Sequence, residues 1–240
     1  MVKRMCATLA LTLLPALAWG EAPLKLMVVH RPPYLVVEPG GQFGGVTVAP
    51  AKAAFKKAGI DVQWEEVPAL RQLQRLKDNK ESVCSVGWYR TTEREAFAKF
   101  STPLSQDSPW AAFSNAALLA PPNLTVKSLL ADEHVTVLLK TGFVYGSYLD
   151  SQIAVMKAQR KETSGDMLQV LQMVAFGRAQ VTFAPREELQ YYLDRQLIGG
   201  NGSKIITFRE IPDGYNRHLM CSKRVADALL DKFNAALAAH

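Results

Sequence analysis

The sequence has 240 residues, 48% hydrophobic and 21% charged, which is typical of a globular protein and excludes a disordered, fibrous or collagen-like chain. Its 28 basic and 22 acidic residues give a net charge of +6. These charges are scattered and form no basic run, so we expect no nucleic-acid partner. The four His and three Cys residues show no metal-ligand spacing. We therefore expect no metal, and no other cofactor.

The first 20 residues have the pattern of a secretory signal. Lys3 and Arg4 precede an apolar stretch from Met5 to Leu17, and Ala18-Trp19-Gly20 offers small residues to a signal peptidase. The alternative is a membrane anchor, which needs about 20 apolar residues; this stretch is shorter. We expect residues 1–20 to be removed and the mature chain to reach the bacterial periplasm. Its charge is then +4, because 26 basic and 22 acidic residues remain.

The rest of the chain predicts two successive α/β units. In the first unit we expect strands at residues 24–29, 60–67 and 82–86 and helices at residues 46–58 and around 70–77. After a proline-marked break at residues 121–123, we expect strands at 135–139, 179–183 and 205–208 and helices at 145–153, 166–176 and 186–197. Ser164 is the expected cap of the middle helix. A strand at 219–222 and a helix at 225–237 complete the chain. This order predicts helix-covered, mostly parallel sheets in two lobes, with a ligand cleft between them.

One segment, residues 83–104, carries a family signature. It contains Gly87, Thr91-Thr92-Glu93-Arg94, Phe97, Phe100-Ser101 and Pro103. Weaker matches follow the same order elsewhere: Pro33-Tyr34, Gly44-Gly45-Val46, Leu70-Arg71, Thr141-Gly142 and Gly177-Arg178-Ala179. Together these motifs resemble the bacterial extracellular solute-binding proteins of family 3, whose best-known members bind polar amino acids for uptake transporters.

The resemblance implies a two-lobed periplasmic-binding-protein fold of type II, in which each lobe is a mixed, mostly parallel sheet flanked by helices. The chain crosses between the lobes twice in this fold, here near residues 105–109 and 211–215. Lobe 1 would comprise residues 21–106 and 214–240, and lobe 2 residues 107–213. We expect a monomer.

The resemblance also implies the ligand site. Arg94 would hold the ligand carboxylate; the alternative is a solvated arginine paired with Glu93 or Glu95. Tyr34 would pack over the ligand, or else cover a strand end. Thr141 would close over the carboxylate, or else be a plain turn residue. The other candidate ligand residues are Gly87, Trp88, Tyr89 and Phe143.

The sequence departs from the family where an α-ammonium group would be held. Family members place an acidic residue after the strand that follows Gly-Arg, but the corresponding position falls near Pro185. Glu187 or Glu188 could substitute only if the loop differs. A buried ammonium without a counter-charge is strongly disfavoured. We therefore expect a less polar or ring-bearing acid, with aromatic side chains near the cleft that could equally be core: Trp88, Tyr89, Trp110, Phe143 and Tyr145.

Two cysteines, Cys84 and Cys221, remain after the signal. In an oxidising compartment they are a disulfide candidate; the alternative is two buried thiols in separate strands. In the family fold, the strand at residues 219–222 returns to lobe 1 beside the strand that holds Cys84. A bond then requires that register and side agree.

These features predict a periplasmic solute-binding protein that closes on a small carboxylate-bearing ligand, amino-acid-like or another organic acid. The expected partner is the permease of an ABC-type uptake system or a sensor kinase. The alternatives are a dehydratase-like enzyme on the same scaffold, acting on a cyclohexadienyl acid, and an interaction module with a degenerate cleft. Glu187 and His218 are the candidate acid–base groups for the enzyme, but we expect no enzymatic activity.

Overall fold

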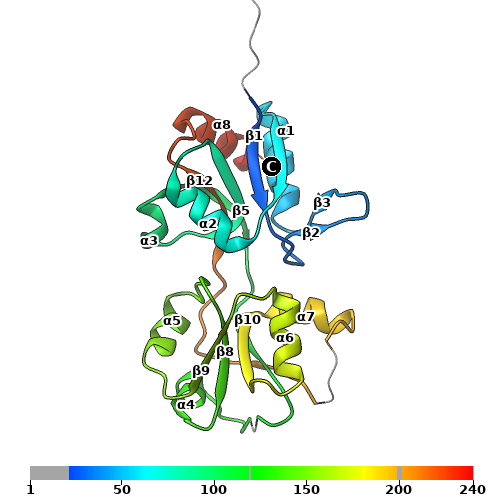
Figure 1. The fold of residues 1–240 in the computed structure, drawn as a ribbon, viewed down its shortest axis with the longest axis vertical. Coiled ribbons are helices and arrows are strands. Elements are labelled where there is room, and N and C mark those ends of the chain that lie inside the picture. Colours follow the sequence, from blue (N-terminus) through cyan, green and yellow to red (C-terminus); the bar gives the residue numbers. More distant parts are fainter. Residues whose placement is uncertain (1–21, 119, 199–201, 240) are drawn as a thin grey trace, which may run out of the picture.

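The computed structural model describes residues 22–118, 120–198 and 202–239. The chain forms two lobes, each built on a five-stranded sheet (Figure 1). The predicted signal at residues 1–20 lies outside the described residues. Within the three described ranges, no helix combines the length and the apolar character needed to cross a membrane.

Lobe 1 has a mixed sheet in the order β4-β1-β5-β12-β6. Its strands are β1 (Leu24–Val28), β4 (Val62–Glu66), β5 (Val83–Tyr89), β6 (Ala98–Gln106) and β12 (Asn216–Ser222). Its helices are α1 (Val48–Ala58), α2 (Ala69–Asp78), α3 (Thr92–Glu95) and α8 (Asp227–Ala238), and β2 (Val36–Val37) pairs with β3 (Phe43–Gly44). Along β1, Leu26 and Val28 face the core under α1 and α8, whereas Met27 faces the core under α2. Helices therefore cover both faces of the sheet.

Lobe 2 has a second mixed sheet, in the order β11-β7-β10-β8-β9. Its strands are β7 (Trp110–Ser114), β8 (Thr136–Lys140), β9 (Gln159–Thr163), β10 (Val181–Pro185) and β11 (Lys204–Thr207). Its helices are α4 (Val126–Ala131), α5 (Ser147–Ala154), α6 (Met167–Ala175) and α7 (Arg186–Asp194). One core packs under α4 and α5, and the other lies under α6 and α7. Asp166, and not the expected Ser164, caps α6, in a reciprocal capping box with Gln169.

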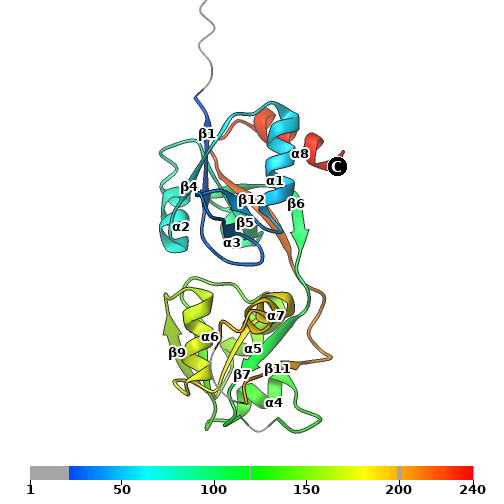
Figure 2. The same cartoon turned by 90° about the vertical axis from the view of Figure 1, so that its right-hand side faces the viewer.

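Two crossings join the lobes, one between β6 and β7 and the other between β11 and β12 (Figure 2). They touch each other, because the Asp107 amide donates to the Tyr215 carbonyl at 3.0 Å. Gly214 permits this approach: a Cβ there would lie 1.8 Å from the Asp107 carbonyl oxygen. The crossings therefore form a narrow, paired connection beside the cleft.

A disulfide joins Cys84 on β5 to Cys221 on β12. The two residues are register partners in neighbouring antiparallel strands, and both are fully buried. The bond therefore ties the returning C-terminal strand to the N-terminal part of lobe 1.

Candidate functional site

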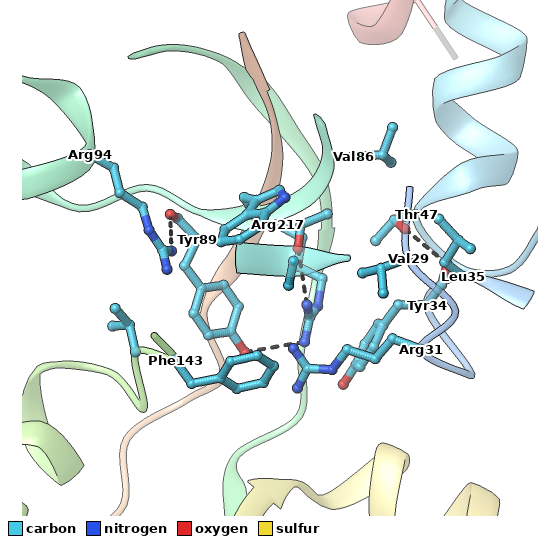
Figure 3. A pocket seen from close by; sticks show the side chains of 14 residues that line it. Val29, Arg31, Tyr34, Leu35, Thr47, Val86, Tyr89, Arg94, Phe143 and Arg217 are labelled. Atoms are coloured by element: carbon cyan, nitrogen blue, oxygen red, sulfur yellow. Dashed lines mark hydrogen bonds between the residues drawn. The ribbon is translucent and has the colours of Figure 1, made fainter. Parts of the chain in front are cut away.

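A small cavity of about 60 Å³ lies between the lobes, where the lobe 1 strands end (Figure 3). Lobe 1 supplies most of the lining, and Phe143 and Val144 close it from lobe 2. The residues that line it are Val29, Arg31, Tyr34, Leu35, Thr47, Ala69, Val86, Gly87, Trp88, Tyr89, Arg94, Phe143, Val144 and Arg217. Three arginines thus meet in one cavity with aromatic walls.

A tight loop after β1 places Arg31 and Tyr34 at the cavity. Two backbone hydrogen bonds between Arg31 and Leu35, at 2.9 and 3.0 Å, close this loop. The Thr47 hydroxyl donates to the Tyr34 carbonyl at 2.9 Å. Gly45 has a φ of +106°, and a Cβ there would lie 2.5 Å from the Tyr34 carbonyl oxygen, so glycine is required for the close approach.

A bulge in β5 directs the next side chains toward the cleft. The pairing of β5 with β12 skips Gly87, which has a φ of +85° that suits glycine. Trp88 and Tyr89 follow at the end of the strand. Thr91 then caps the short helix α3 by accepting a hydrogen bond from the Arg94 amide at 3.3 Å. This turn returns Arg94 to the strand end.

Arg94 is buried without a carboxylate partner. It is only 6% exposed, and one guanidinium nitrogen donates to the Tyr89 carbonyl at 2.9 Å. Its Cζ lies 4.8 Å from the centre of the Trp88 ring. Glu93 and Glu95, the two residues that could have paired with Arg94, pair with other residues: Glu93 with Lys77 and Glu95 with Arg90. Within the described part of the chain Arg94 forms no ion pair.

The three arginines of the cavity differ in their pKa values because Arg31 and Arg217 pair with carboxylates of the chain and Arg94 does not. Burial lowers the pKa of Arg94 to about 10, and the charges of Glu93 and Asp150 offset only part of that effect. Burial also acts to lower the pKa of Arg217, but Tyr89 and Asp107 raise it above its ordinary value. Burial likewise disfavours the charge of Arg31, and Glu188 raises its pKa. Of the three arginines, Arg94 is therefore the one whose positive charge is least balanced by nearby negative charges of the chain.

Arg217 belongs to a buried network with the first crossing. Its guanidinium donates two hydrogen bonds of 2.7 Å to Asp107, one to each carboxylate oxygen. Tyr89 donates its hydroxyl proton to the same carboxylate. Arg217 also lies 3.5 Å from the centre of the Tyr34 ring. This network therefore links three residues that line the cavity, Arg217, Tyr34 and Tyr89, to Asp107 in the crossing between β6 and β7.

Hydrogen bonds between side chains join the lobes directly across the cleft at Arg31 and at Tyr34. Arg31 of lobe 1 donates two hydrogen bonds of 2.7 Å to Glu188 of α7, one to each oxygen. The Tyr34 hydroxyl donates to Glu187, whose other oxygen accepts from the Ser108 amide at 3.1 Å. Burial raises the pKa of Tyr34 well above its ordinary value, so this phenol keeps the proton that it donates.

A larger hollow of about 420 Å³ adjoins the cavity. Arg94, Phe143 and Val144 line both spaces. The hollow lies between α2 and α3 of lobe 1 and the loop after β8, and its other lining residues are Leu70, Leu73, Gln74, Lys77, Glu93, Phe97 and Gly142. The inner cavity therefore combines three guanidinium groups with mostly apolar walls, and the outer hollow has a mixed lining in which Lys77 and Glu93 lie beside Leu70, Leu73 and Phe97.

The structure brings most of the predicted ligand residues together and leaves some outside. Those that line the cavity are Tyr34, Gly87, Trp88, Tyr89, Arg94 and Phe143. Thr141 does not line it: the residue is exposed, and its amide donates to the Thr163 carbonyl at 2.9 Å. Trp110 and Tyr145 are buried in the lobe 2 core. His218 faces away, with Nδ1 2.8 Å from the Ser101 carbonyl oxygen.

Sequence reasoning missed Arg31, Arg217 and Asp107. Arg31 is separated from Glu188 by 157 residues, and Arg217 from Asp107 by 110, so no local spacing reveals either pair. Their positions offered a signal: Arg31 precedes Pro32-Pro33-Tyr34, Asp107 lies within the first expected crossing, and Arg217 follows the second by two residues. Charged residues beside a hinge are candidates for contacts between lobes.

Comparison with known proteins identifies the family. A sequence model of the bacterial extracellular solute-binding proteins, family 3, matches residues 25–240. The chain belongs to this family. No curated protein matches the sequence of this solute-binding protein.

Similar solved structures support the fold of this family 3 member. An ancestral arginine-binding protein bound to arginine has a TM-score of 0.71 at 20% identity, covering 91% of this chain and 92% of the other. The ancestral amino acid-binding protein AncCDT-1, a precursor of cyclohexadienyl dehydratase, has a TM-score of 0.69 at 18% identity, covering 90% and 88%. The periplasmic domain of BvgS from Bordetella pertussis has a TM-score of 0.72 at 18% identity, covering 90% of this chain and 40% of that chain.

Proposed function

We propose that this protein is a solute receptor whose two lobes hold a small carboxylate-bearing ligand, with Arg94 as the anchor of the carboxylate. One observation carries the proposal: Arg94 is buried at the cavity, yet no carboxylate of the described chain pairs with it. Arg31 and Arg217 line the same cavity and each already holds a carboxylate. A buried cation is strongly disfavoured without a counter-charge. A ligand carboxylate would supply it through a charged, two-pronged hydrogen bond.

The sizes of the two spaces, and the place of Arg94 in the lining of both, support a ligand with a small carboxylate end and a larger remainder. The inner cavity of about 60 Å³ has room for a few water molecules, since each needs about 10–15 Å³. A carboxylate fits such a space, but a ring does not. The adjoining hollow of about 420 Å³ offers both apolar side chains and charged or polar ones to the rest of the molecule: Leu70, Leu73, Phe97, Gln74, Lys77 and Glu93. We propose an organic acid whose carboxylate enters the cavity while the rest of the molecule occupies the hollow.

Export and partner choice form the rest of the proposal. The protein would act in the periplasm after loss of residues 1–20, as a monomer whose lobes close by movement at the two crossings. The closed form would be read by the permease of an ABC-type uptake system or by a sensor kinase. Similarity to the substrate-binding protein of an amino acid ABC transporter, at 18% identity and a TM-score of 0.69, supports the first partner.

A dehydratase-like activity has weaker support. Glu187, one acid–base candidate, has each oxygen engaged, with Tyr34 and with the Ser108 amide. His218, the other candidate, is held by the Ser101 carbonyl. Neither is among the residues that line the cavity.

Thermal unfolding with a panel of small molecules tests the proposed function. We expect at least one acid to raise the melting temperature with its concentration, because a ligand that binds only the folded state stabilises it by about 2.7 kcal/mol at 100 times its Kd. Suitable acids are acetate, hexanoate, glutarate, benzoate and 3-phenylpropanoate. The controls are their uncharged amides, which Arg94 would not hold. If the acids leave the melting temperature unchanged while amines or sugars raise it, the proposal is wrong.

A further inference from the structure

The three carboxylates that border the inner cavity are already occupied by groups of the chain itself, whereas Glu93 lines the outer hollow, where it is exposed and pairs with Lys77 at 3.8 Å. Arg31 binds both oxygens of Glu188, whose side chain is fully buried. Glu187 accepts from Tyr34 with one oxygen and from the Ser108 amide with the other. Asp107 is held through both oxygens by Arg217. Each of the three carboxylates that border the cavity therefore has a donor on each oxygen.

Glu187 and Glu188 begin α7, directly after β10, close to the position where the family resemblance expects an acidic residue for a ligand ammonium. An ammonium entering here would find Glu188 neutralised by Arg31. It would also lie beside the unpaired positive charge of Arg94, because Asp107, like Glu188, is already held by an arginine of the described chain. A cation buried next to like charges and without a free carboxylate is strongly disfavoured.

Arg31 is also held in place from two sides, so it does not readily yield Glu188 to a ligand. Its Cζ lies 4.7 Å from the centre of the Phe143 ring and 5.6 Å from that of Tyr34. To free Glu188, a ligand would have to break two charge-assisted hydrogen bonds and these cation–π contacts. Figure 3 shows the Arg31 guanidinium lying between Phe143 and Tyr34.

We infer that the Arg31–Glu188 pair sets the specificity of the cleft against α-amino acids, so that the ligand is a carboxylate with no positively charged nitrogen beside its carboxyl group. This inference rests on the proposed function, because it concerns the same carboxylate held by Arg94. Arg31 acts as a specificity-determining residue, because its guanidinium occupies Glu188 in place of the ammonium group of an amino acid.

Calorimetric titration of matched pairs tests the inference. Each pair is an acid and its α-amino derivative: acetate and glycine, glutarate and glutamate, 3-phenylpropanoate and phenylalanine. In the wild-type protein we expect the acid that binds best to do so at least tenfold more tightly than its amino derivative. In Arg31→Met, Glu188 loses its partner and can pair with an ammonium that enters the space left by the guanidinium, so we expect this ratio to fall at least tenfold. The double variant Arg31→Met/Glu188→Gln should lose that gain.

The outcomes separate the inference from the proposed function. If no acid and no amino acid of the panel binds, the receptor proposal fails and the inference fails with it. If the wild-type protein binds an amino acid as tightly as the matching acid or more tightly, the inference alone is overturned. A folded Arg31→Met variant with an unchanged ratio also overturns it. If circular dichroism shows that Arg31→Met does not fold, the comparison of each acid with its amino derivative in the wild-type protein still tests the inference.

Discussion

Replacing Arg94 with glutamine should weaken binding of the acid ligand at least 100-fold. A charge-assisted hydrogen bond contributes about 1.5–3 kcal/mol, and two such bonds join a guanidinium to a carboxylate. A loss of about 3 kcal/mol corresponds to roughly 100-fold in Kd. Calorimetric titration with the acid that binds best in the thermal panel measures the change.

The matched control for this variant is Arg90→Gln. Arg90 lies in the same segment, but its side chain is 56% exposed and pairs with Glu95 at the surface. We expect Arg90→Gln to bind the acid with a Kd within about twofold of the wild-type value. Exposed ion pairs contribute about 0–1 kcal/mol, and Arg90 does not line the cavity. Equal Kd values for wild type and a folded Arg94→Gln would contradict the anchor role.

Arg94→Gln should also retain the stability of the ligand-free protein. The lowered pKa of Arg94, about 10, means that burial disfavours its charged form at neutral pH. Removing this charge relieves a cost of folding that offsets the loss of the hydrogen bond to Tyr89 and of the contact with the Trp88 ring, so we expect the melting temperature to stay within a few degrees of the wild type. A loss of binding without a loss of stability separates a ligand-binding role from a structural role.

Reduction of the Cys84–Cys221 bond should lower the free energy of unfolding by about 3–5 kcal/mol. In the chain-entropy model the effect grows with the length of the closed loop, and here the cysteines are 137 residues apart. Both are fully buried in neighbouring strands, so the bond ties the two ends of lobe 1 together. Urea unfolding with and without a strong reductant measures the difference.

The double variant Cys84→Ala/Cys221→Ala is the control for reduction. Its unfolding should be insensitive to reductant, whereas the midpoint of the wild type should shift to lower urea concentration. A wild-type midpoint that stays unchanged after a thiol assay shows complete reduction would mean that the bond adds no stability.

Hydrophobic patterns in the sequence predict the positions of most helices and strands well. β1, α1, β4, α2 and β5 lie close to their expected positions, because each alternates or repeats apolar residues at the period of its own structure. Similar patterns locate β8, α6, β10, α7 and α8 in their expected places. The identification of the fold class as a two-lobed α/β architecture is confirmed.

Some elements carry no such pattern and were not predicted. β9 has the sequence QRKET and is largely exposed, so its pairing with β8 comes from backbone hydrogen bonds and not from burial of its side chains. β6 contains Pro103 and several exposed positions, because it lies at the edge of its sheet. β7 is fully buried but follows directly on the expected crossing, and α4 has only six residues.

The residues of the candidate site likewise include some that the sequence predicted and some that it did not. Arg94 was expected from a local motif, and Trp88 and Tyr89 precede it in the same segment. The pairing of Arg31 with Glu188 depends on how the lobes meet, and no sequence pattern contains that information. The sequence predicted altered ammonium binding, because the position that is acidic in the family falls near Pro185 and has no carboxylate. Only the structure shows that the neighbouring Glu187 and Glu188 are both engaged by groups of the chain.

The most direct measurement of the central claim is a crystal structure of the protein with the acid that binds best in the thermal panel. The account predicts electron density for a carboxylate in the inner cavity, with its oxygens about 3 Å from the guanidinium nitrogens of Arg94, and with the Arg31–Glu188 pair intact. A carboxylate bound to Arg31 or Arg217 instead, or a ligand outside the cleft with Arg94 still unpaired, would contradict it.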